Sequence, residues 1–227
     1  MAVCKNTEIK SKKLFDYDFS TQKLVIGTDE AGRGCGAGGV FAAAVCFDNI
    51  SDRLIEKLSI LNDSKKLSKK HREELFEIVK SETINSVVCI EDEEIERINI
   101  LNASLKAMNI ACTDVISRLP DSLKTKELEV LVDGNRAIRN FSYPQRSIIK
   151  GDSTSASIAA ASILAKVSRD RYMLSLDEKY PQYNWRENAG YLTKEHMTLI
   201  DKYGISPFHR PSYLRKHFAK QEQLSLF

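Results

Sequence analysis

The stretch GTDEAGRGCGAGG, residues 27–39, shapes both the fold expected of this chain and the place where its chemistry lies. An apolar run leads into it and predicts a short buried strand over residues 23–29. Asp29 and Glu30 stand side by side where that run ends, and Arg33 follows between two glycines. Neighbouring residues of a strand point to opposite faces, so both acids can face one site only if the strand ends here. The glycines supply that break, because glycine adopts backbone conformations that other residues avoid.

Strand and helix patterns alternate along the rest of the chain. Short apolar runs predict further strands, and apolar residues spaced three and four apart predict helices. The expected strands are residues 40–47, 84–90, 127–135 and 146–152, and the expected helices are residues 68–80, 91–99, 101–119, 155–179 and 193–203. Ser68 and Thr193 are suitable N-caps for two of these helices. Strands mixed with helices in this way indicate an α/β layer fold.

Two further acids, Asp133 and Asp152, also follow apolar runs. Burying a carboxylate is costly unless it is paired or binds a metal. Each acid alone fits a turn or helix cap equally well, because Asp133 precedes a glycine and Asp152 precedes a helix. Four acids at the ends of different strands are harder to explain as caps, since sites in open α/β sheets form where strand ends converge. A carboxylate cluster without histidine or thiol partners favours the hard cations Mg²⁺ or Mn²⁺.

The bulk composition limits the class of protein. The chain has 227 residues, 42% of them hydrophobic, which suffices for one sizeable core. No run approaches the roughly 18 apolar residues of a membrane span, and the polar N-terminus lacks the apolar segment of an export signal. The five cysteines are scattered, with no Cys-x-x-Cys. They predict reduced and mostly buried thiols in a cytoplasmic protein, not a disulfide framework or a zinc site.

Positive charge is concentrated in two segments, although the net charge is only +3. Residues 63–72, DSKKLSKKHR, carry five Lys or Arg, and residues 186–220 carry seven against three acids. Such patches suit a polyanion such as a nucleic acid, while a solvated helix face explains a charge run equally simply.

Several spaced motifs together resemble bacterial ribonuclease HII. In order they are GTDEAGRG, NDSKKLSKKHRE, INILNASLKAM, VLVDGN, KGDSTSASIAAASILAKVSRDR and YPQYNWRENAGYLTKEH, and the resemblance extends over residues 24–216. It implies a ribonuclease-H-like core, in which helices flank a mixed five-stranded sheet, followed by a C-terminal helical part that closes over the substrate. We therefore expect an N-terminal lead (residues 1–22), loosely held, a catalytic core (23–180), a C-terminal helical substrate-binding part (181–220) and a tail (221–227).

The same resemblance implies the chemistry of the four acids. Asp29, Glu30, Asp133 and Asp152 would hold two divalent cations, Mn²⁺ or Mg²⁺. The enzyme would hydrolyse the RNA strand of RNA/DNA hybrids and cut 5′ of single ribonucleotides in duplex DNA, leaving 5′-phosphate and 3′-hydroxyl ends. Its roles would be ribonucleotide excision repair and removal of RNA primers. No protein nucleophile is needed, which agrees with the absence of a Ser-His-Asp or Cys-His arrangement in the sequence.

The resemblance also implies how the substrate is recognised. The backbone of Gly32, Arg33 and Gly34 would touch the ribose 2′-hydroxyl, which is the group that marks RNA. Tyr191 would stack on the sugar that follows the ribonucleotide. Six basic residues are expected phosphate contacts: Lys65, Lys66, Lys166, Arg169, Lys194 and Arg210.

Three other residues of these motifs are expected to be structural. We expect Asp170 to form a salt bridge with Arg169 or Arg171. His196 and His209 are expected to be packed side chains, with phosphate binding as the alternative.

The sequence departs from the family pattern in two places. Residues 35–39, CGAGG, replace a segment that usually contains two prolines, which predicts a looser loop, with up to about 1 kcal/mol of extra unfolded-state entropy per lost proline. Asn188 and Ala189 replace a usual histidine-lysine pair, so a basic phosphate contact is expected to be missing. These changes bear on affinity and geometry, and the four acids are unaffected.

The chain ends in QLSLF, with large apolar residues after a polar stretch. It resembles the short peptide by which bacterial replication and repair proteins dock into the sliding clamp. Gln223 would form hydrogen bonds, and Leu224, Leu226 and Phe227 would insert into the clamp's pocket. A tail that packs back on its own domain is the alternative.

Two other functions were compatible with the residues. One is a ribonuclease HIII-like enzyme, although that family carries an additional domain before its core, for which the position of Asp29 leaves no room. The other is a non-catalytic module that binds nucleic acid or the clamp, which the presence of all four acids argues against. No feature of the sequence predicts an obligate dimer, so a monomer is expected.

Overall fold

A mixed five-stranded sheet forms the centre of the molecule in the computed structural model, which describes residues 4–224. Its strands are β1 (Leu24–Ala31), β2 (Val40–Cys46), β3 (Ile84–Ile90), β4 (Leu128–Asp133) and β5 (Gln145–Ile148), in the order β3-β2-β1-β4-β5. The first three strands are antiparallel neighbours, while β1, β4 and β5 run parallel. This arrangement confirms the expected α/β fold and sheet.

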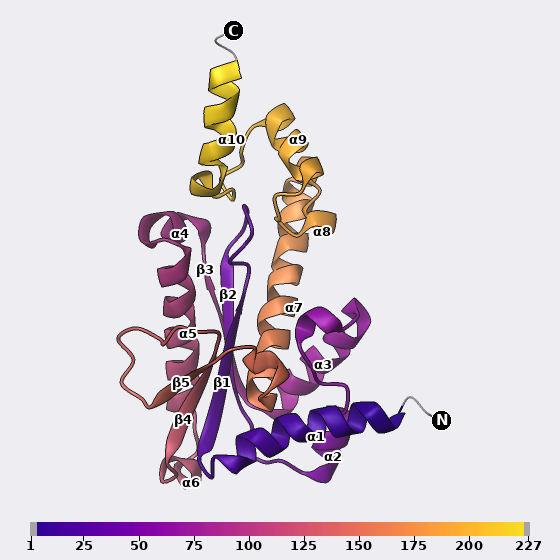
Figure 1. The fold of residues 1–227 in the computed structure, drawn as a ribbon, viewed down its shortest axis with the longest axis vertical. Helices are drawn as coiled ribbons and strands as arrows, with labels where there is room; N and C mark the ends of the chain where they lie inside the picture. The colour runs from indigo at the N-terminus through magenta and orange to yellow at the C-terminus, as the bar shows by residue number, and fades with distance from the viewer. Residues whose placement is uncertain (1–3, 225–227) are drawn as a thin grey trace.

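Helices cover both faces of the sheet, as Figure 1 shows. The α-helices are α1 (Cys4–Ser20), α2 (Asp52–Lys57), α3 (Lys69–Glu82), α4 (Asp92–Ile98), α5 (Ile100–Ser117), α6 (Asp121–Lys124), α7 (Ala156–Lys179), α8 (Trp185–Asn188), α9 (Lys194–Tyr203) and α10 (Pro211–Leu224). Short 3₁₀ turns are η1 (Ser64–Lys66), η2 (Gly151–Ser153) and η3 (Pro181–Tyr183). None of the helices in the described part of the chain is long and apolar enough to cross a membrane.

Strand β2 shows why the central strands read as continuous apolar runs. Every residue of β2 is buried, because helices cover the sheet on both sides. Ala42 and Ala44 pack in the cluster that contains α5, whereas Ala43 and Val45 pack with α3 and α7. Alternate residues of one strand thus supply two cores, as the pleat of a strand requires.

Helix α7 approaches the sheet very closely at Gly27. A Cβ atom on Gly27 would lie 2.2 Å from backbone atoms of Ser157 and Ile158, a distance at which no side chain fits. The first half of α7 is correspondingly rich in fully buried alanine and serine. The absence of side-chain bulk on both elements therefore sets the separation of helix and sheet.

Two strands end at different places from those expected. β1 does not stop at Asp29: it continues to Ala31, and Asp29 and Glu30 pair with Ala43 and Ala42 of β2. The parallel pairing of β1 with β4 ends at Thr28, so β1 beyond that point is bordered by β2 alone. The strand expected to reach Asp152 ends at Ile148, and Asp152 lies in the turn η2.

Residues 11–20 of the N-terminal segment are packed on the domain, in contrast to the loosely held lead that we expected from its polarity. The segment contains α1, whose Leu14 and Phe15 are buried in the core cluster on the α7 side of the sheet. The sequence signal was weak because polar and charged residues surround Leu14 and Phe15.

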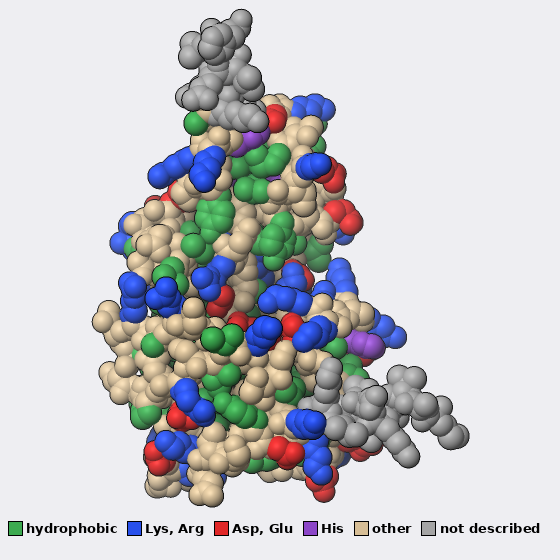
Figure 2. Space-filling view, viewed as in Figure 1, with side chains coloured by type: hydrophobic (Ala, Val, Ile, Leu, Met, Phe, Trp, Pro, Cys, Tyr) green, Lys and Arg blue, Asp and Glu red, His purple; other side chains and the backbone are tan. Residues whose placement is uncertain are grey.

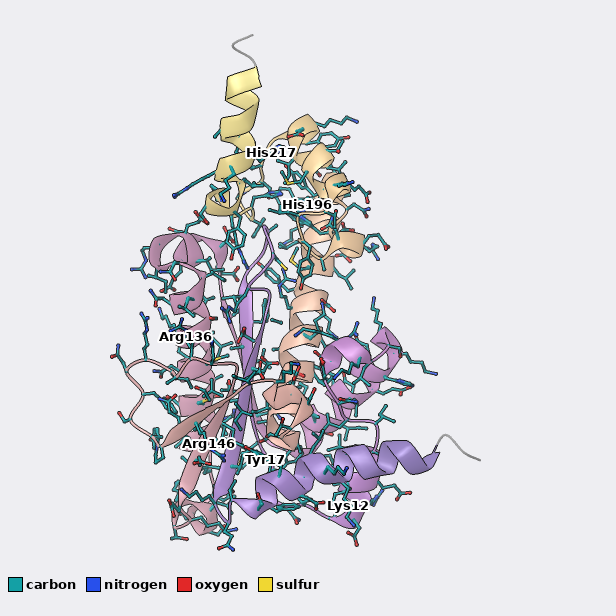
Figure 3. The ribbon with its side chains drawn as sticks, viewed as in Figure 1. Lys12, Tyr17, Arg136, Arg146, His196 and His217 are labelled. Atoms are coloured by element: carbon teal, nitrogen blue, oxygen red, sulfur yellow. The ribbon has the colours of Figure 1, made fainter. Side chains whose placement is uncertain are left out.

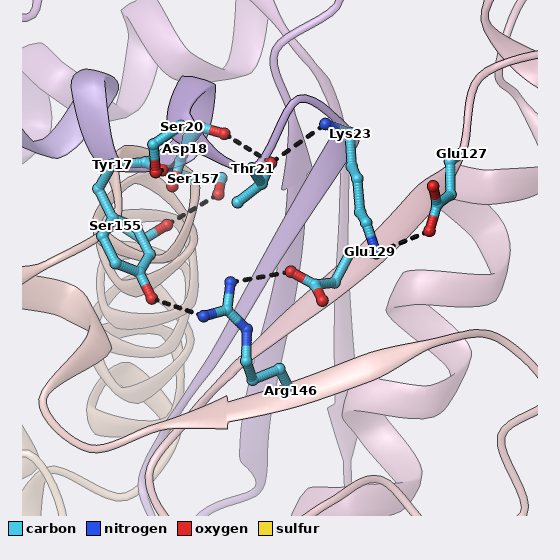
Figure 4. A network of polar contacts seen from close by, with 10 residues as sticks. All are labelled: Tyr17, Asp18, Ser20, Thr21, Lys23, Glu127, Glu129, Arg146, Ser155 and Ser157. Carbon is cyan, nitrogen blue, oxygen red and sulfur yellow. Dashed lines mark hydrogen bonds and ion pairs between the residues drawn. The ribbon is translucent and has the colours of Figure 1, made fainter.

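Polar contacts attach the end of α1 to the rest of the domain (Figure 4). Asp18 is buried, and its Oδ2 accepts the Ser157 N–H at 2.8 Å, in the first turn of α7. Burial raises the pKa of Asp18 to about 6, although hydrogen bonds from Ser155 and Ser157 act against the rise. Arg146 of β5 donates to the Tyr17 hydroxyl at 3.2 Å and to Glu129 of β4 at 2.9 Å.

The helical C-terminal part is assembled around aromatic rings and two histidines. Tyr183 and Trp185 are buried and stack with their ring centroids 5.1 Å apart. His196 and His209 are also buried, with exposures of 0% and 2%. Both histidines are therefore packed side chains, as expected, and His196 lies inside the C-terminal part in Figure 3.

Hydrogen bonds determine which nitrogen of each histidine carries the proton. The backbone N–H of Ser206 donates to His209 Nδ1 at 2.9 Å, so the proton of neutral His209 lies on Nε2 and donates to His196 Nε2 at 3.1 Å. His196 Nε2 also accepts from the Trp185 indole at 3.1 Å, and its Nδ1 donates to the carbonyl of Tyr191 at 2.9 Å. This chain of hydrogen bonds holds only while both rings are neutral.

The histidine pair predicts a pH dependence of folding stability. Burial, together with the neighbouring His196, lowers the pKa of His209 to about 4. The unfolded value is about 6.5, so stability is fully present above that pH and is lost as the pH falls towards 4. We expect a loss of at most about 3 kcal/mol in the free energy of unfolding from this group.

Urea denaturation between pH 4 and pH 8 measures this loss as the difference between the wild type and His209→Asn. The difference is needed because Asp18, with its raised pKa, gains stability as the pH falls and partly masks the effect. His71→Asn, on the exposed side of α3, is the matched control and should leave the wild-type pH profile unchanged. The prediction fails if His209→Asn has the same pH profile as the wild type.

Candidate active site

The four predicted acids come together from three parts of the fold. Asp29 and Glu30 lie in the extension of β1, Asp133 is the last residue of β4, and Asp152 lies in η2. Asp29 is only 8% exposed and interacts electrostatically with all three other acids. The structure therefore gathers residues from distant parts of the chain into one acidic cluster.

The charges of the cluster oppose one another. Burial, followed by the charges of Glu30, Asp133 and Asp152, raises the pKa of Asp29 well above its usual value. Burial also raises the pKa of Glu30, although Arg33 acts against the rise. The pKa of Asp152 is raised by burial and by nearby carboxylates. A set of buried carboxylates that resist ionisation requires positive charge to be stable in the ionised form.

Local contacts hold several of these side chains. Asp29 Oδ1 accepts the N–H of Glu30 at 2.7 Å, and Asp133 Oδ1 accepts the N–H of Gly151 at 2.7 Å. Glu30 forms a salt bridge with Arg33 at 3.0 Å. Asp133 thus fixes the turn that carries Asp152.

The donor set matches a hard divalent cation in chemistry and charge, because it consists of carboxylate oxygens. The side chains do not form a closed cage: within residues 4–224, no group of three or more His, Cys, Asp or Glu could hold a metal ion as arranged. The carboxylate of Glu30 is paired with Arg33. The four carboxylates therefore suit a divalent cation because they supply oxygen ligands and lie together at one end of the sheet.

Asp63, the N-cap of η1, and Lys65, within η1, also belong to this cluster. Asp63, which was not predicted from the sequence, lies close enough to Asp152 for its charge to raise the pKa of that residue, and it accepts the N–H of Lys65 at 2.9 Å. Partial burial opposes the charge of Lys65, but the carboxylates, chiefly Asp29 and Asp152, raise its pKa overall. Both residues lie in the motif NDSKKLS. The acid in this otherwise basic motif is the feature of the sequence that could have identified Asp63.

A cavity of about 220 Å³ lies beside the acids. It is lined by Asp29, Glu30, Ala31, Gly32, Arg33, Gly34, Ser64, Lys65, Ser162, Lys166, Arg169 and Tyr191. In Figure 2, acidic side chains at the middle of this face are flanked by Lys and Arg. The cavity therefore brings Asp29 and Glu30, the glycine-arginine-glycine segment and Tyr191 into one space.

Gly32 begins the loop over this cavity, which we call the glycine loop (residues 32–39). Its φ of +99° is one that side-chain-bearing residues rarely adopt. A Cβ atom there would lie 2.2 Å from Arg169 Nε and 3.0 Å from the carbonyl of Gly39. Both conformation and space therefore require glycine at this position.

The backbone of Tyr191 is held by two hydrogen bonds, although the residue is 47% exposed. Its N–H donates to the carbonyl of Asn188 at 2.9 Å, and its carbonyl accepts from His196. The neighbouring thiol of Cys35 in the glycine loop, followed by burial, raises the pKa of the Tyr191 hydroxyl. An exposed aromatic ring on a fixed support is suited to stacking against a ligand.

The two departures from the family pattern have structural roles. Buried Asn188 donates to the carbonyl of Tyr183 at 2.7 Å and accepts the N–H of Gly190 at 2.8 Å, which shapes the turn before Tyr191. The segment of residues 35–39 is packed in the folded protein: a Cβ on Gly36 would lie 2.4 Å from Leu192. The folded loop is therefore not loose, and the added entropy of the unfolded chain stays a prediction.

The predicted lysines differ in their surroundings. Lys166 lines the cavity but forms a salt bridge with Asp170 at 2.7 Å. The expectation that Asp170 pairs with Arg169 or Arg171 was therefore wrong, because Lys166 lies one helical turn earlier on the same face. Lys66 donates to Ser153 at 3.2 Å, and Lys194 is exposed at the start of α9.

Arg169 and Arg210 do not have the free side chains expected of phosphate contacts. Arg169 is 1% exposed and donates to the carbonyls of Ala37 at 3.1 Å and Ala189 at 2.9 Å. Arg210 is fully buried and also donates to backbone carbonyls. The sequence showed their charge but not their burial behind the glycine loop.

The predicted clamp peptide lies at the end of α10. The helix extends to Leu224, so it crosses the expected boundary at residue 221 and includes Gln223. Leu226 and Phe227 lie outside the described residues.

The chain is similar in sequence and in fold to known proteins. A family model described as Ribonuclease HII matches residues 26–221. The ribonuclease HII of Rickettsia akari is 48% identical over 190 residues, which cover 84% of this chain and 91% of that protein. The ribonuclease HII of Fusobacterium nucleatum is 45% identical over 218 residues, with coverage of 95% and 97%. A chain of the PCNA:RNase HII complex from Archaeoglobus fulgidus has a TM-score of 0.64 at 27% identity, covering 82% of this chain and 93% of that chain.

The acidic cluster predicts that loss of one charge stabilises the fold. Asp29→Asn should raise the free energy of unfolding by about 1–2 kcal/mol at pH 8 with EDTA, because it removes a buried charge that like charges oppose. Asn can still accept the N–H of Glu30. Urea denaturation measures the change, and Asp16→Asn on the exposed side of α1 is the control. Equal or lower stability of Asp29→Asn would contradict the repulsion described above.

Proposed function

The chain belongs to the ribonuclease HII family, and we propose from this premise that it hydrolyses the RNA strand of RNA/DNA hybrids. We further propose that it cuts 5′ of single ribonucleotides in duplex DNA and leaves 5′-phosphate and 3′-hydroxyl ends. The observation that carries the proposal is the shared cavity: Asp29, Glu30, Gly32–Gly34 and Tyr191 line one space. Groups suited to hydrolysis and groups suited to recognising a ribose thus lie side by side.

The acidic cluster supplies the catalytic part of this proposal. Asp29, Glu30, Asp133 and Asp152 would hold two divalent cations, Mn²⁺ or Mg²⁺, because their oxygens are hard ligands and their charges are unbalanced. When bound, such ions supply an activated water and neutralise charge on the phosphate that is cut. Asp133 also positions Asp152, since it accepts the N–H of Gly151.

The surrounding residues supply binding and orientation. Arg33 and Lys65 border the acids and would contact the phosphates on either side of the scissile bond. Lys166 and Lys194 would extend this contact along the strand. The charge of Lys65 is favoured by the acids themselves, so it is protonated before the nucleic acid arrives.

Recognition of RNA would come from the glycine loop and Tyr191. A backbone without side chains at Gly32 and Gly34 allows close approach of a ribose 2′-hydroxyl. Tyr191 would stack on the sugar that follows, because its ring is exposed and its backbone is held by Asn188 and His196. The substrate would be selected by its sugar, not by its base sequence.

We also propose a partner, the bacterial sliding clamp. The ribonuclease HII in the Archaeoglobus fulgidus structure is in a complex with PCNA. In this chain α10 leads away from the sheet to the end of the described chain, and it lies at the far end of the molecule from α1 (Figure 1). The proposed clamp peptide begins with Gln223 and Leu224, the last two residues of α10. Docking there would leave the cavity open to nucleic acid, which fits roles in ribonucleotide repair and removal of RNA primers.

A cleavage assay tests the proposed activity. Duplex DNA with one ribonucleotide should be cut 5′ of that residue by the wild type with Mn²⁺ or Mg²⁺, and the matched all-DNA duplex should remain intact. Asp29→Asn should reduce the rate at least about 100-fold, because it removes a charged ligand, while binding of the duplex is retained.

Binding without cleavage by the wild type with either metal would instead identify a non-catalytic module. A requirement for several consecutive ribonucleotides would identify a ribonuclease HIII-like specificity.

A truncation tests the proposed partner. Deletion of residues 223–227 should abolish capture by the immobilised bacterial clamp, because it removes the anchoring side chains. Cleavage of a short duplex should be unchanged, since the cavity lies elsewhere. Undiminished capture of the truncated protein would refute the docking role of this peptide.

A further inference from the structure

Arg210 is a buried cation with an unusual set of partners. Its side chain has 0% exposure, and within residues 4–224 no carboxylate forms a salt bridge with it. A buried charge without a counter-ion is costly unless it is well hydrogen-bonded. The partners of Arg210 are therefore the evidence for its role.

Those partners are backbone carbonyls of the glycine loop. Arg210 Nη1 donates to the carbonyls of Gly32 and Cys35, each at 2.8 Å, and Nε donates to the carbonyl of Gly38 at 2.9 Å. The backbone N–H of Arg210 also donates to the carbonyl of Gly36 at 2.8 Å. One residue from the C-terminal part thus holds the glycine loop at both of its ends.

Tyr213 provides a second set of contacts with the same loop. Its hydroxyl donates to the carbonyl of Arg33 at 2.6 Å, and its ring lies 5.5 Å from the guanidinium of Arg210. Arg210 Nη1 is also 3.5 Å from the carbonyl of Arg33. The carbonyls of Gly32 and Arg33 are therefore both directed towards the C-terminal part.

The direction of these carbonyls determines the direction of the amides. The described residues contain no cis peptide, so the C=O and the N–H of each peptide point in opposite directions. Because the carbonyls of Gly32 and Arg33 point towards Arg210 and Tyr213, the N–H groups of Arg33 and Gly34 point the other way. Gly32, Arg33 and Gly34 line the cavity, whereas Arg210 and Tyr213 are not among its lining residues.

We propose that Arg210 is a positioning residue for ribose recognition, which it achieves by holding the glycine loop so that the amides of Arg33 and Gly34 face the bound sugar and its phosphate. The inference rests on the proposed function, because it assigns those amides to the ribonucleotide. Arginine suits this position, since its planar fork donates several hydrogen bonds in fixed directions. Lysine keeps the charge but cannot reach three carbonyls with the same geometry.

The test measures discrimination between sugars instead of activity alone. Arg210→Lys is made in an Asp29→Asn background, so that the substrate is not cut. Dissociation constants are measured for a short DNA duplex with one ribonucleotide and for the same duplex made only of DNA. Arg146→Lys is the matched control, because Arg146 forms hydrogen bonds with Tyr17 and Glu129 far from the glycine loop.

Arg210→Lys should reduce the preference for the ribonucleotide duplex about tenfold, as expected for misdirected hydrogen bonds at a binding site. Affinity for the all-DNA duplex should change less than about twofold, because charge and phosphate contacts remain. Arg146→Lys should leave both constants unchanged. If Arg210 had a purely structural role, its replacement would weaken the binding of both duplexes by the same factor. That result would overturn the proposal.

A second variant covers the case in which Arg210→Lys does not fold. Tyr213→Phe removes only the hydroxyl that holds the carbonyl of Arg33, on a partly exposed residue, and should reduce the preference about threefold. An unchanged preference in a folded Tyr213→Phe protein would overturn the proposal. If the Asp29→Asn parent itself shows no preference for the ribonucleotide duplex, the recognition part of the proposed function fails first, and the role of Arg210 fails with it.

Discussion

The close contact between α7 and β1 is the constraint on which the rest of the structure depends. Gly27 leaves no room for a side chain against the backbone of Ser157 and Ile158, and the helix meets the sheet through alanine and serine. This contact places η2 and Asp152 just before the helix and Lys166 and Arg169 about three to four turns along it. The same helix then carries the C-terminal part above the sheet (Figure 1). A wider separation would move the acidic cluster and the cavity apart.

The candidate site combines two opposite electrostatic arrangements. On one side, Asp29 and its neighbours are buried negative charges that oppose one another and favour a cation. On the other side, Arg169 and Arg210 are buried positive charges whose partners are carbonyl dipoles. The glycine loop lies between them, and its lack of side chains allows both approaches. The C-terminal part is therefore a component of the site, since Tyr191, Arg210 and the histidine pair connect it to this loop.

Sequence patterns predicted the elements well where the signal was local. The apolar runs of β2 and β3, and the N-caps Ser68 and Thr193, are where we expected them. The end of β1 was wrong because pairing with β2 continues past the acids, and pairing depends on a partner that local patterns do not reveal. Helix α1 was missed because its buried Leu14 and Phe15 stand in a segment that is otherwise rich in polar residues. Partners such as Lys166 for Asp170 depended on side-chain directions along α7.

The sequence by itself determined the types of residue available for chemistry: four acids after apolar runs, a glycine-arginine-glycine segment and an isolated tyrosine in a family motif. These follow from composition and order, which are properties of the chain alone. Only the tertiary structure decided that Asp63 joins the acids and that Arg169 and Arg210 face inwards. The physical reason is that charge is a property of a residue, whereas burial and hydrogen-bond partners are properties of its surroundings. Those surroundings are assembled from segments more than a hundred residues apart, as the bond from Arg210 to Gly32 illustrates.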